Sequence, residues 1–440
     1  MAGSSAAAAT ASGRDRDADT ASRRGKLSSE QRRLVALLGL PTFALALSLT
    51  VVTTYLPVVA ADVFGSRVFI GLIVGMEGLM ALWVPLVAGT WSDQLRTRWG
   101  GRLPFLIAGT PVLAGCAAAL GFVRTPGLIA GLMATFLIAY FVAYEPYRAL
   151  YPDAMPDEVE GRAQSVQALF RGLGTATALL GGGLLLSIAE PVPFAVTAAV
   201  AAAILGTFAV ALVKRGVPGR GPETPGYENV RAAARHLFSL LRKHATLREF
   251  MAANALWEMS IGALKTWVIL YISRGLGFSL PVAAGAVGIV AVFVLIAAGL
   301  SGKIGDHEGR LRTMQYALPV YGVGLIVPFL VTNPWVVGVV APVVGLGGGV
   351  VMALPYSILT PLMPDEDHGA LTGFYTFSRG VGIGLGPLLA GVAISVLSGP
   401  FSGTQGYQAM WGVCAAAVLT SLVFVRRLRR RTAELREAGT

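Results

Sequence analysis

The tetrapeptide Met-Pro-Asp-Glu occurs twice in this chain, at residues 155–158 and again at residues 363–366. Other pairs keep the same spacing of 208 residues: Gly161 with Gly369, and Arg171-Gly172 with Arg379-Gly380. A fixed offset of nearly half the 440-residue chain indicates that one structural unit has been duplicated. The sequence therefore predicts a fold built from two similar halves.

Apolar stretches lie on both sides of each copy of the tetrapeptide. A membrane-spanning helix needs about 20 apolar residues, and runs of that length recur with short polar breaks. We expect twelve helices, at 34–60, 67–91, 104–123, 127–151, 164–188, 192–213, 250–273, 279–301, 314–331, 335–360, 372–397 and 407–426. Six helices per copy place both copies in the same orientation, as parallel repeats. The predicted fold class is an all-α membrane protein of two parallel-repeat six-helix bundles.

The composition supports a membrane protein and argues against several other classes. Apolar residues make up 54% of the chain and charged residues 13%, against about 25% in a soluble domain. Two cysteines in separate apolar runs favour neither a disulfide framework nor a metal site, and four scattered histidines do not favour one either. No phosphate-binding G-x-x-x-x-G-K-[ST] loop is present, so ATP is not the expected energy source.

The distribution of the net charge of +11 along the chain indicates membrane topology and does not indicate nucleic-acid binding. With the amino terminus inside, 28 of the 35 Lys and Arg residues fall on the inner side and three on the outer side. We expect a multi-pass protein of the inner (cytoplasmic) membrane with both termini cytoplasmic. The expected divisions are a disordered tail at 1–33, bundles at 34–213 and 249–427, a linker at 214–248 and a tail at 428–440.

The loops after the second and eighth expected helices carry similar charges and glycines. The second copy reads Gly302-Lys303-Ile304-Gly305-Asp306-His307-Glu308-Gly309-Arg310. An aspartate at one helix end near basic residues of the next can hold one rigid-body arrangement and release it in another, although a single copy would equally suit a solvated turn. We predict gating loops with these members: Asp93, Arg98, Gly100, Arg102, Asp306, Gly309 and Arg310.

The stretch from Gly302 to Arg310 resembles the G-x-x-x-D-(R/K)-x-G-(R/K) signature of the major facilitator superfamily, with His307 at a usually basic position. That resemblance covers residues 34–427 and implies a transporter working by alternating access. Residues 92–105 and the run Pro146-Tyr147-Arg148-Ala149-Leu150 are similar to stretches of the glycoside-pentoside-hexuronide and sucrose:cation symporters. This branch implies a sugar or glycoside as the substrate.

Melibiose-type carriers of that branch bind sodium through aspartates of helix 2, and the matching positions here are Ala81 and Pro85. Protons are therefore the expected coupling ion. Acidic groups within expected helices are candidates, because a charge in the bilayer core costs about 2.5–3.5 kcal/mol and usually faces a cavity or a partner. The candidates for proton coupling are Glu77, Glu258 and Glu145. For Glu77, permanent pairing with a neighbouring helix is an equally good interpretation.

Two helices supply the candidate substrate path. Asn254, Glu258 and Lys265 lie at i, i+4 and i+11, so they share one face of the seventh helix. Tyrosines form a stripe on the fourth helix next to Glu145 and Arg148, for which packing and local ion pairing are the alternatives. The predicted path residues are Asn254, Trp257, Lys265, Tyr144, Tyr147 and Arg148.

Arg171 and Arg379 occupy equivalent places in the two copies. Equivalence suggests a shared structural role, such as bonding helix ends or the acidic loop residues Asp157 and Asp365. Recognition of an anionic substrate is the alternative.

The sequence thus predicts proton-coupled secondary transport of a small organic solute, with a sugar or glycoside as the first expectation. The alternative is a proton-antiport exporter of a drug or natural product. Such exporters usually carry G-P-x-x-G-G in helix 5, where residues 172–183 contain no proline. No Ser/His/Asp set or soluble domain favours a sensor or an enzyme. We expect no cofactor and no bound metal, and the proton gradient is the expected energy source. The expected partners are the lipid bilayer and a small-molecule substrate, with no nucleic acid. The protein is expected to be a monomer.

Overall fold

The computed structural model describes residues 29–154, 157–215, 230–363 and 371–438. The helices of the first half are α2 Ser29–Val63, α3 Arg67–Gln94, α4 Leu103–Leu120, α5 Pro126–Ala154, α6 Asp157–Ile188 and α7 Val192–Arg215. After α8 Val230–Lys243, the long helices of the second half are α9 Ala245–Leu270, α10 Leu280–Glu308, α11 Arg310–Leu330, α12 Pro334–Ala353, α14 Leu371–Val396 and α15 Ala409–Ala438. Short helical segments lie at η1 Tyr271–Gly275, α13 Pro355–Leu359, η2 Thr360–Leu362 and η4 Ser402–Thr404.

Twelve helices in these described ranges are long and apolar enough to cross a membrane. This confirms the expected number and the all-α membrane fold. Turn residues separate the helices as their chemistry requires. The Ser66 hydroxyl accepts a hydrogen bond from the backbone N–H of Phe69 at the start of α3. Gly309, at φ +88°, turns the chain between α10 and α11 in a conformation that other residues rarely adopt.

Three segments differ from the expectation. The helix expected over 335–360 ends at Ala353, and Pro355 starts the short helix α13, because proline has no N–H to continue the ladder. The expected linker contains the amphipathic helix α8. The apolar residues of this short helix repeat with helical spacing, but no helix was predicted there from the sequence. The last helix, α15, continues to Ala438, past the residue at which a tail was expected.

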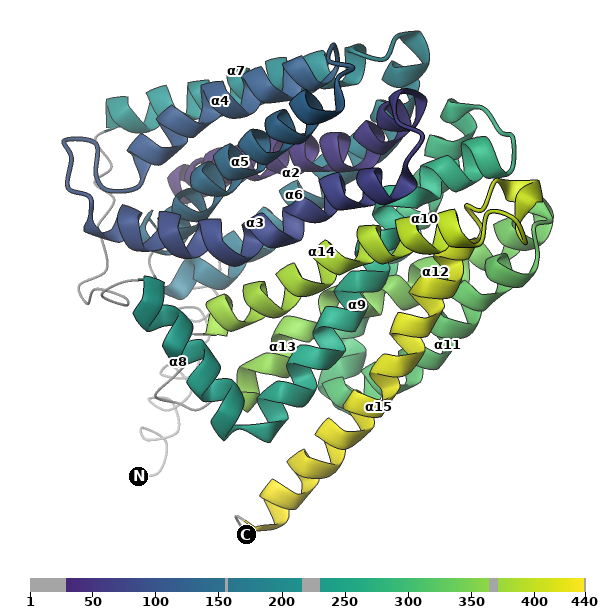
Figure 1. The fold of residues 1–440 in the computed structure, drawn as a ribbon. Coiled ribbons are helices and arrows are strands. Elements are labelled where there is room, and N and C mark those ends of the chain that lie inside the picture. The colour runs from purple at the N-terminus through teal and green to yellow at the C-terminus, as the bar shows by residue number, and fades with distance from the viewer. Residues whose placement is uncertain (1–28, 155–156, 216–229, 364–370, 439–440) are drawn as a thin grey trace, which may run out of the picture.

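The long helices form two groups, α2–α7 and α9–α15, side by side in Figure 1. Within the first group α2 packs on α6 and α7, and α4 on α5 and α7; within the second, α9 packs on α14 and α15, and α10 on α12. Among the described helices the groups are joined mainly by α3 with α14, α6 with α10, and α2 with α9, and also where α3 meets α9. The end at which α2 starts and α15 finishes, toward the lower left of Figure 1, is called the terminal side here, and the opposite end the far side.

The contact between α3 and α14 depends on glycines. A Cβ atom at Gly71 would lie 2.4 Å from the Pro387 carbonyl oxygen, and one at Gly75 would lie 2.5 Å from that of Gly384. One at Gly78 would lie 2.2 Å from both the Gly380 carbonyl oxygen and the Gly384 nitrogen. Small residues allow this close backbone approach, which is a frequent way of packing membrane helices. The two halves therefore meet here with no side chain between them.

Candidate functional site

An ion pair joins the two halves where α3 passes α9. The Lys265 Nζ lies 3.4 Å from the Glu77 Oε2. The Glu77 side chain is 6% exposed and that of Lys265 is 26% exposed. Glu77 lies near the middle of α3, and its neighbours Gly75 and Gly78 allow this part of the helix to pack closely on α14. The pair neutralises two charges that would each be costly inside a bilayer.

A second ion pair lies one helix further into the second half. The Arg379 Nε of α14 is 3.1 Å from the Glu258 Oε1 of α9. The Glu258 side chain is 9% exposed, whereas that of Arg379 is 47% exposed. Glycine again brings the helices together, because a Cβ at Gly382 would lie 2.7 Å from the Glu258 Cβ. The Arg379 guanidinium is thus held by a carboxylate on one side and accessible on the other.

The first half contributes charged and phenolic groups from α5 and α6. Glu145 and Arg148, three residues apart on α5, lie 4.0 Å from each other, as local pairing required. The Arg171 guanidinium of α6 donates a hydrogen bond of 2.8 Å to the Tyr144 hydroxyl. The ring of Tyr144 stacks on that of Tyr140, with centroids 5.4 Å apart.

Two tyrosines connect these groups into one cluster. Tyr375 of α14 lies close enough to Arg171 and Arg148 of the first half for electrostatic interaction. Tyr140 of α5 is similarly close to Arg171 and Glu77. The cluster therefore combines side chains from α3, α5, α6, α9 and α14 between the two halves. Tyr375 was missed in the sequence, although its position one helical turn before Arg379 was a usable signal.

Three residues expected on the path are enclosed by helix packing in this conformation. Asn254 and Trp257 are both 0% exposed; the Asn254 amide donates to the Ser378 Oγ at 2.7 Å, and the Trp257 Nε1 donates to the Ser421 Oγ at 2.8 Å. Tyr147 is also 0% exposed and donates to the Leu38 carbonyl. These contacts tie α9 to α14 and α15, and α5 to α2. The accessible members of the expected path are Lys265, Tyr144 and Arg148.

The two repeat-related arginines do not share one set of contacts. Arg379 pairs with a carboxylate of α9, whereas Arg171 contacts a phenol of α5. The shared structural role expected for the two arginines therefore stays a prediction. The side chains of Asp157 and Asp365, the other suggested partners, lie outside the described residues.

The loops predicted to act as gates show local contacts. The Arg310 guanidinium lies 3.2 Å from the Asp306 Oδ1 and donates to the Ser357 carbonyl at 2.9 Å. In the first loop, Gly100 adopts φ +83°, the Arg98 guanidinium lies 4.6 Å from the Trp99 ring centroid, and Arg102 is 6% exposed. The Asp93 side chain lies outside the described residues, so its gating role stays a prediction.

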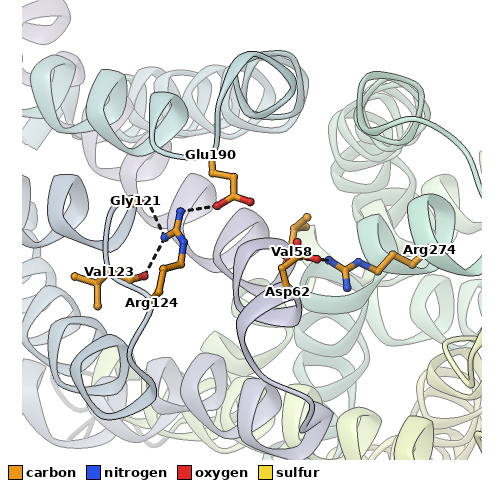
Figure 2. A network of polar contacts seen from close by, with 7 residues as sticks. All are labelled: Val58, Asp62, Gly121, Val123, Arg124, Glu190 and Arg274. Atoms are coloured by element: carbon orange, nitrogen blue, oxygen red, sulfur yellow. Dashed lines mark hydrogen bonds and ion pairs between the residues drawn. The ribbon is translucent and has the colours of Figure 1, made fainter.

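On the far side, an ion pair bridges the two halves (Figure 2). Arg274, in η1 after α9, lies 2.5 Å from the Asp62 Oδ1 at the end of α2 and also approaches the Val58 carbonyl at 3.4 Å. A second pair in the same figure, Arg124 with Glu190 at 2.5 Å, joins two loops of the first half only. The first pair thus bridges the halves and the second does not.

Replacing Asp62 by asparagine is expected to favour opening of the far side. The side chains of Asp62 and Arg274 are 57% and 28% exposed, so their attraction is worth about 0.2–1 kcal/mol, or up to about fivefold in the opening equilibrium. Opening is measured as labelling of Val58→Cys by an impermeant maleimide, in a chain without Cys116 and Cys414. Glu190→Gln is the matched control. Equal labelling in all three proteins would refute a closing role for the Asp62 pair.

Among the described residues no group of three or more His, Cys, Asp or Glu side chains could hold a metal ion. The carboxylates, cations and phenols of the cluster form ion pairs and hydrogen bonds. Such groups can bind a polar solute and change their partners when the halves move.

Curated relatives match parts of the chain. The Multidrug resistance protein MdtG of Escherichia fergusonii is 26% identical over 201 residues, which are 44% of this chain and 47% of that protein. Dipeptide and tripeptide permease B of Salmonella typhimurium is 26% identical over 174 residues, 38% of this chain and 34% of the permease. The Staphyloferrin B transporter of Staphylococcus aureus is 32% identical over 140 residues, 32% of this chain and 31% of the transporter. The matched region thus spans about half the length of the relatives at most.

Solved structures show the same fold over almost the whole chain. A bacterial homolog of the human lysosomal transporter Spinster, in an inward-facing and unoccupied conformation, superposes with a TM-score of 0.71 at 14% identity, covering 92% of this chain and 96% of that one. The nucleoside transporter NupG gives 0.71 at 14% identity, covering 90% and 98%. The family profile of the Major Facilitator Superfamily matches residues 38–387 and 294–440. With its twelve spans and paired bundles, the chain is a multi-pass membrane transport protein and belongs to the Major Facilitator Superfamily.

Proposed function

We propose that this secondary transporter moves a small organic solute by alternating access and that protons drive the movement. The observation that carries the proposal is the ion pair of Glu77 with Lys265. It joins the two halves at the charged cluster, between spanning helices of each half, and a second ion pair bridges the halves on the far side. A charge change at this pair acts directly on the contact between the two bodies that must move.

Protonation of Glu77 removes the attraction that holds α3 to α9. The carboxylate is 6% exposed, and an ionised group at this depth is stable only beside a partner. A neutral Glu77 releases Lys265, so the halves separate at lower cost, and loss of the proton restores the pair. Glu258 and Glu145 have arginine partners within their own half, which makes them weaker candidates for coupling motion to protonation.

The lining of the cluster bears on the substrate. The cluster consists of charged and phenolic side chains, which favours a solute with charged or strongly polar groups over the neutral sugar expected from the symporter resemblance. The relatives named above are a multidrug resistance protein, a staphyloferrin B transporter and a dipeptide and tripeptide permease, so the glycoside branch stays a prediction. Export by proton antiport is the second candidate, and the similarity to the multidrug resistance protein favours it.

Orientation is proposed from the distribution of charge along the sequence, and the oligomeric state from the packing of the two halves. The excess of Lys and Arg in the loops and tails of the terminal side places that side in the cytoplasm of a cell with an inner membrane. We expect a monomer, because each half packs on the other through α3, α6 and α2 and the cluster is complete within one chain.

Solute-driven proton movement is the expected result in proteoliposomes that contain the full chain and a pH-sensitive dye. The panel is a glucoside, a dipeptide and an amphiphilic cationic drug, each added to one side, with liposomes lacking protein as the control. Proton flux in the direction of the solute identifies symport, and flux in the opposite direction identifies antiport. Solute flux that neither moves protons nor responds to a pH gradient would refute the coupling.

A further inference from the structure

We propose that Arg171 binds the oxyanion group, a carboxylate or a phosphate, of the solute that is transported. This inference rests on the proposed transport function and names the chemical class of its substrate. It follows from a difference between the two halves at positions that the duplication makes equivalent.

The second half gives its arginine a carboxylate, and the first half does not. Arg379 on α14 pairs with Glu258 on α9 at 3.1 Å. At the repeat offset of 208 residues, Arg171 on α6 corresponds to Arg379 on α14. The helices before the first loop are offset by 213 residues, as the starts of α3 at Arg67 and α10 at Leu280 show, so Leu45 on α2 takes the place of Glu258. No acidic residue occurs anywhere in 34–61, the membrane-spanning part of α2. The first half therefore keeps the cation of this pair without its anion.

The contacts of Arg171 leave most of its donors available. Its guanidinium is exposed and donates one hydrogen bond, to the Tyr144 hydroxyl at 2.8 Å. The structure shows no ion pair between Arg171 and any described carboxylate. An arginine has five N–H donors in a planar fork, which matches the two oxygens of a carboxylate or phosphate.

A second unsatisfied donor lies one helical turn away. The Gln167 side chain is 8% exposed, and its Nε2 has no hydrogen-bond partner among the described residues. Gln167 and Arg171 are four residues apart, so they share one face of α6. A buried amide donor left unpaired costs about 1–3 kcal/mol, which a ligand oxygen would recover. Two neighbouring hydrogen-bond donors with no carboxylate paired to them among the described residues are the features of an anion-binding site.

The charges of the cluster also leave one cation without a matching anion among the described side chains. Among the described side chains three acids are each matched by one cation, in these pairs: Glu77 with Lys265, Glu258 with Arg379, and Glu145 with Arg148. Arg171 is the remaining cation of the cluster. An uncompensated cation within a membrane protein is costly, so one added negative charge balances the site. Tyr375 of α14, in electrostatic range of Arg171, brings the second half to the same place.

The test uses binding to the purified full chain in lipid nanodiscs, followed by the rise of its Tm with ligand. The probes are three matched sets: benzoate with benzamide, phenyl phosphate with phenol, and dialanine with dialanine amide. We expect at least one oxyanion to bind about tenfold or more tightly than its neutral partner, the usual worth of a hydrogen bond to a charged group. The better oxyanion identifies carboxylate or phosphate as the group recognised.

Variants decide whether Arg171 is responsible. In Arg171→Gln the oxyanion preference is expected to disappear, and Arg171→Lys should keep part of it, because lysine retains the charge but not the fork. Arg312→Gln, at an exposed arginine of α11, is the control and should keep the full preference. Equal binding of acid and neutral partners, an unchanged preference in Arg171→Gln, or no oxyanion binding at all overturns the proposal.

The outcome is separable from that of the proposed function. A neutral solute that drives proton flux in the proteoliposomes would leave proton-coupled transport standing and overturn the oxyanion site. Oxyanion binding without any proton movement would do the reverse.

Discussion

Uphill movement of solute is expected to be lost when Glu77 is replaced by glutamine, while exchange of solute down its own gradient continues. Glutamine keeps the size of the side chain and cannot be ionised, so it resembles the protonated state permanently. The ion pair that Glu77 forms with Lys265 at 3.4 Å is absent from the variant. The variant therefore no longer distinguishes a proton-loaded from a proton-free state. Rigid-body motion of the halves does not itself require the charge.

The measurement is the accumulation ratio of solute in proteoliposomes with a gradient of one pH unit. Such a gradient stores about 1.4 kcal/mol per proton, enough for about tenfold accumulation with one coupled proton. The ratio should fall to one in Glu77→Gln, and counterflow should persist. Glu249→Gln is the control, because that carboxylate is also mostly buried but pairs with Arg431 inside the second half. Full accumulation by Glu77→Gln would remove the residue from the coupling role.

Gly78→Ala is expected to open the far side and to stop turnover. The added Cβ would lie 2.2 Å from backbone atoms of Gly380 and Gly384, and backbone cannot move aside as a flexible side chain can. The clash requires α3 and α14 to separate. Overpacking of this kind costs about 1–3 kcal/mol, or about fivefold to more than a hundredfold in the equilibrium between closed and open states.

Labelling of Val58→Cys from the far side measures the opening, in the same chain without native cysteines. Gly89→Ala is the matched control on α3, because a Cβ there meets nothing within 4 Å. Both substitutions raise helix propensity by the same amount, so that effect cancels in the comparison. The packing role would be disproved by a Gly78→Ala protein that labels and transports like Gly89→Ala.

Features that depend on local sequence were predictable. Apolar runs of about 20 residues identified the twelve spans, because a helix in a bilayer satisfies its own backbone and needs only length and hydrophobicity. The pairing of Glu145 with Arg148 was foreseeable for the same kind of reason, since three residues on a helix fix the distance between side chains. The break before Pro355 follows from proline chemistry and could have been predicted.

Features that depend on how helices face one another were not predictable. Asn254 shares a polar face of α9 with Lys265, and Trp257 lies next to that face. Both are nevertheless enclosed against α14 and α15, because those helices supply the hydroxyls of Ser378 and Ser421. The sequence showed that this face is polar. It could not show which part of the face meets a neighbouring helix and which part meets the space between the halves.

The sequence by itself determined a duplicated twelve-helix membrane protein, its two glycine-containing loops and the presence of costly charges within the spans. These properties depend on length, period and spacing along one chain, whereas transport was implied by the resemblance of the loops to a known family. Only the tertiary structure decided that Glu77 pairs with Lys265, 188 residues away, and that Arg171 contacts a phenol whereas its counterpart Arg379 pairs with a carboxylate. The physical reason is that each spanning helix is stable in any rotation about its axis. Side-chain partners are therefore selected by packing between helices, which in this protein is set by glycines where backbones touch.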